Sequence, residues 1–346
     1  MTSSVLTSQF GLTEKLTSSA AERALVKKLD AALERVEAGL KNELRFADQV
    51  ADVTATYLLD AGGKRVRPVL TLLAAELGGG ANDQVIKAAQ VVEITHLASL
   101  YHDDVMDDAP LRRGVPTAQL VWGNAVAVLT GDLLFARASQ LIADLGERAI
   151  RLQADTFERL CMGQLHETVG PQPGEDPVAH YLKVLADKTG SLIAAAAQFG
   201  VVFSGAPAEY EPAVLEFGEK IGIAFQLVDD VIDLSTTDAD TGKQAGTDLR
   251  AGVVTMPLLK LRASAATDAS AADLLAYLES DVIGAPEDVD VSAGIERLRA
   301  HAVTAETIAD AREWAAQAVA ALAPLPDGAV KKALTRFADS VVDRNN

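Results

Sequence analysis

The chain has 346 residues and is acidic, with 31 Lys and Arg against 49 Asp and Glu and a net charge of −18. Because nucleic-acid backbones are bound by clustered cations, this balance argues against a nucleic-acid partner. A single cysteine, Cys161, excludes a disulfide framework within the chain, and the polar segment 1–15 lacks the apolar run of a signal peptide, so we expect a cytoplasmic protein.

Apolar residues recur mainly at helical spacing, with Ala and Leu dominant, and alternating strand patterns are hard to find. This pattern predicts an all-α protein with a single domain over residues 1–346, of which 1–20 are less ordered. In chain order, helices are expected at 20–61, 68–77, 84–107, 118–145, 148–169, 178–203, 209–234 and 255–264, followed by several Ala-rich helices.

Two connections and two uncharged stretches stand out between and within these helices. Residues 109–116 form a loop with two arginines and two prolines, and 235–254 form a long polar loop, which inside a compact domain is commonly functional. Residues 114–131 and 189–208 carry no charge and are about as long as a membrane span. Gly, Pro and polar residues interrupt both, so we expect buried core helices.

Two aspartate clusters share the spacing Asp-Asp-x-x-Asp, each at the C-terminal end of an expected helix. They comprise Asp103, Asp104 and Asp107, and Asp229, Asp230 and Asp233. Positions i and i+4 lie on one helix face, about 6 Å apart along the axis. Carboxylates at a helix C-terminus oppose the macrodipole, so a cation is needed to neutralise them. Magnesium fits, since it is held by one or two carboxylates with waters and substrate phosphates.

The alternative interpretation of these aspartates is a solvated acidic face. A single cluster would leave that interpretation open, but two clusters of identical spacing favour a metal site. No cysteine cluster accompanies them, which argues against structural zinc.

Cationic side chains accompany both clusters and suggest that diphosphates are bound. Singly, each is more commonly a surface charge, but together they suit a site for two diphosphates, one bound through metals and one through Arg and Lys. They are Lys64, Arg65 and Arg67, Arg112 and Arg113, Lys188, and Lys243. His96 shares a helix face with Asp103 and is expected to donate to a phosphate, and Gln226 is placed likewise before Asp233.

These motifs, in this order, resemble those of the trans-isoprenyl diphosphate synthase (polyprenyl synthetase) family, of the long-chain type. The resemblance extends from about residue 40 to the end and rests on 62–68, 96–114, 188–190 and 225–257. It implies antiparallel helices around a deep central cavity, a homodimer, and the addition of isopentenyl diphosphate to an allylic diphosphate.

The resemblance also implies a role for each matching residue. Magnesium, as three ions with substrate bound, would be held by Asp103, Asp104, Asp107, Asp229 and Asp233, with Asp230 nearby. Isopentenyl diphosphate would be bound by Lys64, Arg67, His96 and Arg113, and the allylic diphosphate by Arg112, Lys188 and Lys243. The reacting carbons would be lined by Thr189 and Gln226.

In the implied mechanism, metal and cations stabilise the departing diphosphate, and the double bond of isopentenyl diphosphate attacks the allylic cation. A proton is then lost, and no protein nucleophile is required. The chain departs from the family pattern at Val253, where a lysine is common, and Asp108 is an additional carboxylate without an assigned role.

Product length is predicted from the residues that precede the first aspartate cluster. In the family, large side chains one or two helical turns upstream form the floor of the cavity. Here the corresponding residues Thr95, Ala98 and Ser99 are small, so we expect a long product of the quinone-tail class. The alternative is a floor that lies deeper or is contributed by a partner subunit.

Three other functions compete with this interpretation. A class I terpene cyclase would not need the isopentenyl diphosphate residues, and a non-catalytic partner subunit would typically lack intact aspartate motifs. A nonenzymatic metal- or lipid-binding protein would leave the cationic motifs unexplained. Peripheral membrane contact during product release stays open.

Overall fold

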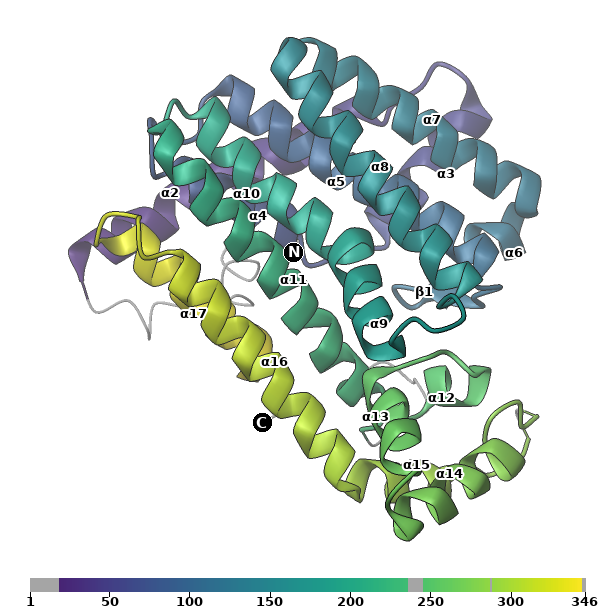
Figure 1. The fold of residues 1–346 in the computed structure, drawn as a ribbon. Coiled ribbons are helices and arrows are strands. Elements are labelled where there is room, and N and C mark those ends of the chain that lie inside the picture. Colours follow the sequence, from purple (N-terminus) through teal and green to yellow (C-terminus); the bar gives the residue numbers. More distant parts are fainter. Residues whose placement is uncertain (1–18, 236–244, 287, 344–346) are drawn as a thin grey trace. The chain divides into compact units, whose positions relative to one another are not determined.

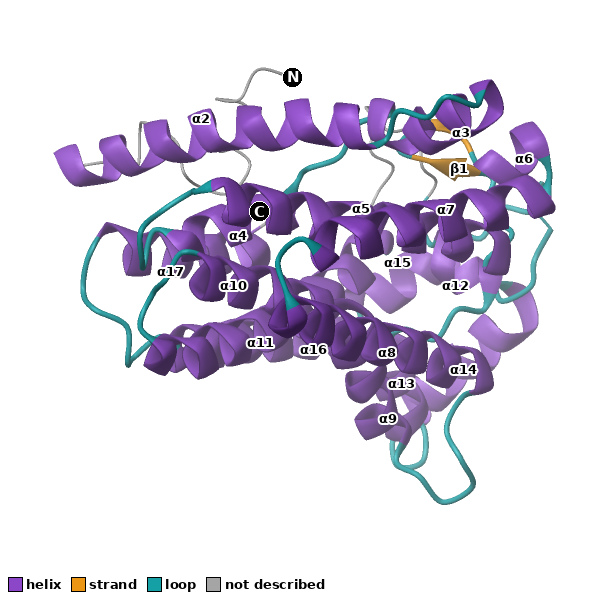
Figure 2. Ribbon diagram, turned by 90° about the horizontal axis from the view of Figure 1, so that it is seen from above, coloured by secondary structure: helices purple, strands orange, loops and turns teal. Residues whose placement is uncertain are grey.

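The computed structural model describes residues 19–235, 245–286 and 288–343. In these ranges the regular structure is helical apart from one short hairpin, β1 (Leu111–Arg112) and β2 (Val115–Pro116), drawn in orange in Figure 2. The prediction of an all-α fold is therefore confirmed.

The chain divides into two compact units, which are described separately. Unit 1 comprises Met1–Leu160, Ser191–Glu219 and Val319–Phe337, and unit 2 comprises Cys161–Gly190, Lys220–Ala318 and Ala338–Asn346. A single domain with a central cavity stays a prediction.

Unit 1 contains most of the N-terminal half of the chain (Figure 1). Its helices are α2 (Ala20–Glu43), α3 (Gln49–Asp60), α4 (Val66–Ala75), α5 (Asp83–Met106), α6 (Ala118–Trp122), α7 (Asn124–Ala143), α10 (Ser191–Phe203) and the 3-10 turn η2 (Ala208–Tyr210). It also includes the first part of α8 (Glu147–Val169), the first part of α11 (Glu211–Asp233) and most of α17 (Ala329–Val342).

Helix α5 is the centre of unit 1. Its buried residues lie on all sides, because α2, α4, α7 and α10 each pack against it (Figure 2). A helix that is apolar all round belongs in a core. It begins at Asn82, whose side chain accepts a hydrogen bond from the Val85 amide at 2.9 Å, and it ends in the first aspartate motif.

Three predicted helices are interrupted in the structure, and one of them, expected at 178–203, is divided by the π-helix Ala186–Gly190. The helix expected at 20–61 is two helices, because side chains compete for backbone donors between them. Asp48 accepts from the Ala51 amide at 2.9 Å, and Asp52 accepts from the Phe46 amide at 2.9 Å. The helix expected at 118–145 is broken at Gly123, whose φ of 87° lies in the region that favours glycine.

Helix α7 is, among the described helices, the one long and apolar enough to cross a membrane by length and composition. It also carries Asp132 and Arg137 and packs along α5.

Unit 2 contains the second aspartate motif and the helices that follow it. These are α9 (Pro177–Leu185), the π-helix η1 (Ala186–Gly190), α12 (Thr247–Ala251), α13 (Met256–Ser264), α14 (Ala269–Asp281), α15 (Ser292–Ala300) and most of α16 (Ala302–Ala321). Unit 2 also holds the final parts of α8, α11 and α17.

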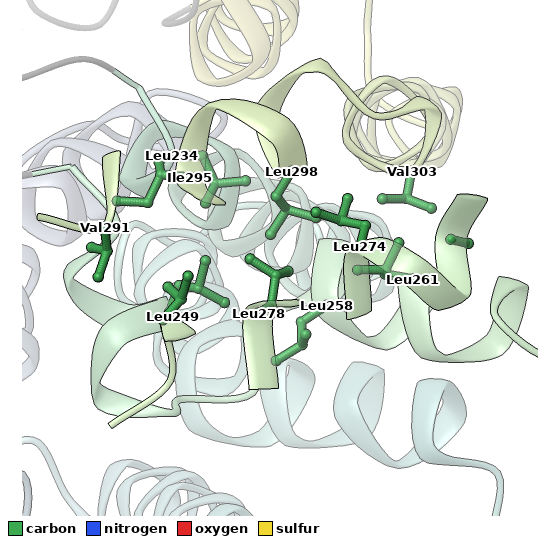
Figure 3. Packing of buried hydrophobic residues seen from close by; sticks show 12 residues of the cluster. Leu234, Leu249, Leu258, Leu261, Leu274, Leu278, Val291, Ile295, Leu298 and Val303 are labelled. Atoms are coloured by element: carbon green, nitrogen blue, oxygen red, sulfur yellow. The ribbon is translucent and has the colours of Figure 1, made fainter. Parts of the chain in front are cut away.

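A buried apolar cluster fixes the end of α11 in unit 2. Figure 3 shows Leu234, directly after the aspartate motif, beside Ile295 of α15, and the same cluster contains Leu249 of α12 and side chains of α13 and α14. The burial of this cluster positions the second aspartate motif and the start of α12 relative to each other.

Candidate active site

The first aspartate motif forms the last turn of α5 in unit 1. Asp103 is half-buried, and Asp107, which caps the helix, is exposed. Asp104 is different: it is fully buried, and its Oδ1 accepts a hydrogen bond from Arg112 Nε at 2.7 Å. Burial raises the pKa of Asp104, and the Arg112 charge opposes that shift. The side chain of Asp104 therefore holds Arg112 in place, while Asp103 and Asp107 are more accessible.

The short hairpin β1–β2 positions both arginines that follow the motif. Arg112 pairs with Val115 across the hairpin, and Arg113 lies in the turn with a φ of 54°. The Arg113 guanidinium donates to the carbonyls of Leu58, at 2.6 Å, and Gly62. Since these carbonyls lie at and just beyond the end of α3, the cation also interacts favourably with that helix dipole.

The segment before α4 carries a buried charge network that sequence analysis did not find. Arg65 is 5% exposed and adopts a φ of 52°. Its Nε donates to Glu37 at 2.5 Å and its Nη1 to the buried Glu93 at 3.3 Å. Arg65 therefore fixes the segment from which Lys64, which is exposed, and Arg67 project.

Arg67 and His96 lie in a locally cationic environment. Burial lowers the pKa of Arg67 to about 10, with Glu93 opposing and Arg113 adding to that shift. Burial also lowers the pKa of His96 well below its usual value, and the charges of Arg67, Arg113, Arg112 and Arg65 lower it further. His96 is therefore neutral near pH 7 and can donate one hydrogen bond from its ring.

An unpaired donor marks this cluster as a site for an anion. Arg67 Nε is buried, and no hydrogen-bond partner for it is present among the described residues. A buried guanidinium N–H without an acceptor is unfavourable, so an anionic ligand that supplies oxygens would relieve it. The cluster of Arg67, Arg113 and His96 therefore fits a phosphate group.

The three residues proposed to control product length are buried on α5. Thr95 Oγ1 accepts a hydrogen bond from Gln153 Nε2 of α8 at 2.7 Å, and Ser99 Oγ donates to the His96 carbonyl at 2.9 Å. Ala98 lies where α7 crosses, since a Cβ added to Gly131 would be 3.2 Å from the Ala98 carbonyl oxygen. Gln153 was not singled out in the sequence, because a lone glutamine on a helix carries no signal.

The second aspartate motif ends α11 in unit 2. Asp233 Oδ2 accepts from the Asp248 amide at 3.2 Å, at the start of α12. Asp229 is half-buried, whereas Asp230 is 6% exposed. The Tyr181 hydroxyl donates to Asp230 at 2.9 and 3.0 Å, and the Met256 amide donates to it at 2.9 Å. Tyr181 is a further residue that sequence analysis missed.

Burial raises the pKa of Asp230 to about 7, and the hydrogen bonds from Met256 and Tyr181 oppose this shift. Burial, followed by the nearby Asp230 charge, also raises the pKa of Tyr181, which keeps its hydroxyl protonated as the donor.

The π-helix η1 positions Lys188 and Thr189 in unit 2. A Cβ added to Gly163 of α8 would lie 2.5 Å from the Lys188 nitrogen, and one added to Gly222 of α11 would lie 2.5 Å from Gly190 Cα. Two glycines therefore allow both helices to approach η1 closely. π-Helical turns inside α-helices are frequent at functional sites.

Lys188 pairs with a carboxylate that was not anticipated. Its Nζ lies 2.5 Å from Glu167 Oε2 of α8. Thr189 and Gln226 are half-buried in the same unit. Lys243 lies outside the described residues.

Among the described residues, no group of three or more His, Cys, Asp or Glu side chains converges as a metal site. The accessible pair Asp103 and Asp107 nevertheless offers carboxylate oxygens on one helix face. Such a donor set fits an ion that takes its remaining ligands from water and substrate phosphates.

Comparison with known proteins identifies the family. A model of the polyprenyl synthetase family matches residues 48–285. The chain is 43% identical to nonaprenyl diphosphate synthase of Mycobacterium tuberculosis over 316 residues, 91% of this chain and 93% of that protein. It is 30% identical to octaprenyl diphosphate synthase of Escherichia coli, covering 90% of this chain and 95% of that protein.

Solved structures agree with the sequence matches. A polyprenyl synthase from Caulobacter crescentus, complexed with calcium and isoprenyl diphosphate, superposes with a TM-score of 0.83 at 33% identity, covering 95% of this chain and 99% of that one. A geranylgeranyl pyrophosphate synthase from Corynebacterium glutamicum, with the same ligands, gives a TM-score of 0.80 at 40% identity over 93% and 97% of the two chains. The fold and motifs define an all-α prenyltransferase. Within that class, the chain belongs to the polyprenyl synthetase family.

Proposed function

We propose that this chain is a magnesium-dependent, all-trans polyprenyl diphosphate synthase that adds isopentenyl diphosphate units to an allylic diphosphate and releases a long-chain product. One observation carries the proposal: in unit 1, an accessible carboxylate pair and a cationic cluster with an unpaired Arg67 donor are built on and around one helix. Membership of the polyprenyl synthetase family supports the reaction type.

Isopentenyl diphosphate is assigned to Lys64, Arg67, His96 and Arg113. Arg67 Nε supplies a donor that is otherwise unsatisfied, and neutral His96 supplies a ring N–H. Arg65 does not need to touch the ligand, because its guanidinium already binds Glu37 and Glu93. Its role is to hold the segment that presents Lys64 and Arg67.

Magnesium is assigned to the two aspartate motifs, as three ions with substrate bound. Asp103, Asp107, Asp229 and Asp233 are the ligands that this proposal favours, since Asp104 and Asp230 are buried against other partners. When bound, magnesium neutralises the negative charge that develops on the departing diphosphate. The calcium in the Caulobacter and Corynebacterium complexes supports the use of a divalent cation.

The chain's cations act on the allylic diphosphate. Arg112, held by Asp104, and Lys188, held by Glu167, are assigned to it together with Lys243, and Thr189 and Gln226 are assigned to line the reacting carbons. The allylic C–O bond breaks, and its electron pair leaves with the diphosphate. The isopentenyl double bond then attacks the allylic cation, and a proton passes to the diphosphate. The residues thus provide fixed charges and no nucleophile.

A long product is proposed because Thr95, Ala98 and Ser99 place no large side chain on α5 before the motif. The similarity to the mycobacterial nonaprenyl diphosphate synthase supports this assignment.

The assembly is proposed to be a cytoplasmic homodimer that contacts a membrane only peripherally, for product release. Exposed apolar side chains on α6 and α7 support a dimer, because a second copy of the chain would bury them. Leu120 is 61% exposed and Leu129 is 65% exposed. Sedimentation equilibrium of the protein with Leu129→Glu would test this, since a charge at a dimer interface should yield monomers.

Product analysis tests the proposed reaction. Purified protein is incubated with magnesium, isopentenyl diphosphate and farnesyl diphosphate, and the dephosphorylated prenyl alcohols are resolved by mass. A magnesium-dependent ladder that ends in long species is expected. Products stopping after one or two additions would contradict the long-chain assignment, and no condensation with any primer would favour the partner-subunit alternative.

A further inference from the structure

The second aspartate of the second motif is turned into unit 2. Asp230 is 6% exposed and is bound by the Tyr181 hydroxyl, at 2.9 and 3.0 Å, and by the Met256 amide, at 2.9 Å. These hydrogen bonds hold the buried carboxylate as a fixed internal group.

Tyr181 is itself held firmly. It lies on α9 and packs against an apolar cluster that includes Leu185, Leu227 and Met256. Its hydroxyl therefore joins three elements of unit 2: α9, which leads directly into the π-helix with Lys188, α11, which carries the motif, and the start of α13.

Helix geometry connects this anchor to the metal ligands. Successive residues of an α-helix are separated by about 100° around its axis, so Asp230 lies to one side of the face shared by Asp229 and Asp233. Fixing Asp230 inward sets the rotation of the last turn of α11. The face with Asp229 and Asp233 is then presented in one orientation.

We infer that Tyr181 is a positioning residue for the metal site: through Asp230 it holds the last turn of α11 so that Asp229 and Asp233 can bind magnesium. This inference rests on the proposed function for the metal role of Asp229 and Asp233. Residues that orient metal ligands without touching the metal commonly change metal affinity by about 10- to 100-fold when replaced.

The test compares Tyr181→Phe with Tyr277→Phe. Both variants lose one hydroxyl in unit 2, but Tyr277 packs its ring on the Arg297 guanidinium, 4.8 Å away, and belongs to the cluster around α14 and α15. Binding of Mn²⁺ in the presence of inorganic pyrophosphate is measured from the electron paramagnetic resonance signal of the free ion, and thermal unfolding is recorded alongside.

Tyr181→Phe is expected to weaken Mn²⁺ binding about tenfold, and Tyr277→Phe to leave it unchanged. In the condensation assay, Tyr181→Phe should need more magnesium for half-maximal rate while keeping most of the maximal rate. Adding Tyr181→Phe to Asp230→Asn should cause no further loss of Mn²⁺ binding, because the hydroxyl acts through Asp230.

Equal Mn²⁺ binding by Tyr181→Phe and the unchanged protein, with only a lower unfolding temperature, would overturn the inference, as would no Mn²⁺ binding by the unchanged protein. If Tyr181→Phe does not fold, Asp230→Asn tests the same link, and unaltered Mn²⁺ binding would overturn it. Failure of the proposed function is distinguishable: the unchanged protein would then form no prenyl product, while Mn²⁺ binding would still depend on Tyr181.

Discussion

Arg112 Nε and the buried Asp104 carboxylate lie 2.7 Å apart, and this ion pair links the end of α5 to the β1–β2 hairpin. Asp104 is fully buried, whereas the Arg112 side chain is 31% exposed. The pair therefore fixes the Nε end of the Arg112 guanidinium, and the other N–H donors of this group can reach a ligand. On the proposed assignment of Arg112 to the allylic diphosphate, Asp104 acts on that substrate through Arg112, whereas Asp103 and Asp107 are more accessible.

Replacement of Asp104 should impair use of the allylic substrate. Asp104→Asn removes the charge that orients Arg112, so kcat/KM for farnesyl diphosphate should fall by roughly 10- to 100-fold, since a charge-assisted hydrogen bond contributes about 1.5 to 3 kcal/mol. The KM for isopentenyl diphosphate should change little. Asp108→Asn is the matched control, because Asp108 is exposed and Asn tolerates its φ of 48°. Steady-state kinetics of both variants decide the matter, and equal losses would contradict this role.

Replacement of Arg65 should destabilise unit 1. Arg65→Met leaves Glu93, which is 2% exposed, without the cation that hydrogen-bonds to it, and breaking a buried ion pair costs about 3 to 5 kcal/mol. Arg35→Met removes an exposed ion pair with Asp83 and should change the free energy of unfolding by less than about 1 kcal/mol. Urea unfolding of both variants measures the difference. If the two variants were equally stable, the buried network would not be stabilising.

The low pKa of His96 predicts a pH dependence of stability. The unfolded side chain takes up a proton below its usual pKa of 6.5, but the folded one does not until a much lower pH. The free energy of unfolding should therefore decrease as pH falls below 6.5, because the unfolded state binds more protons. His96→Gln lacks this titration, so its unfolding free energy should decrease less over that range. Parallel curves for the two proteins would show that His96 is protonated when folded.

A large side chain at position 98 should shorten the product. Ala98→Phe fills space on the buried side of α5 that the growing prenyl chain is proposed to use. Ala38→Phe, on the exposed face of α2, is the control and should leave the product unchanged. Mass analysis of the prenyl alcohols from both variants gives the answer. An unaltered ladder from folded Ala98→Phe would place the floor of the product site elsewhere.

Sequence alone was sufficient to identify the all-α class and to locate the motifs. Helical periodicity is a local property, so α5, α8 and α11 were predicted within a few residues of their observed bounds. The identical spacing of the two aspartate clusters and the cationic segments near them were visible for the same reason. The breaks at 44–48 and at Gly123 were missed, because periodic apolar residues continue across both and hide the local capping signals.

The tertiary structure decided which member of each aspartate motif is buried and which is accessible. The sequence spacing does not distinguish Asp103 from Asp104, or Asp229 from Asp230. Only packing shows that the second aspartate of each pair is buried. The partners Arg112, Tyr181 and Glu167 become neighbours through folding, between 8 and 49 residues away from the groups they bind. Burial and long-range contacts are properties of the packed chain. Those properties, absent from any local pattern, separate the buried Asp104 and Asp230 from the more accessible aspartates that are proposed to bind magnesium.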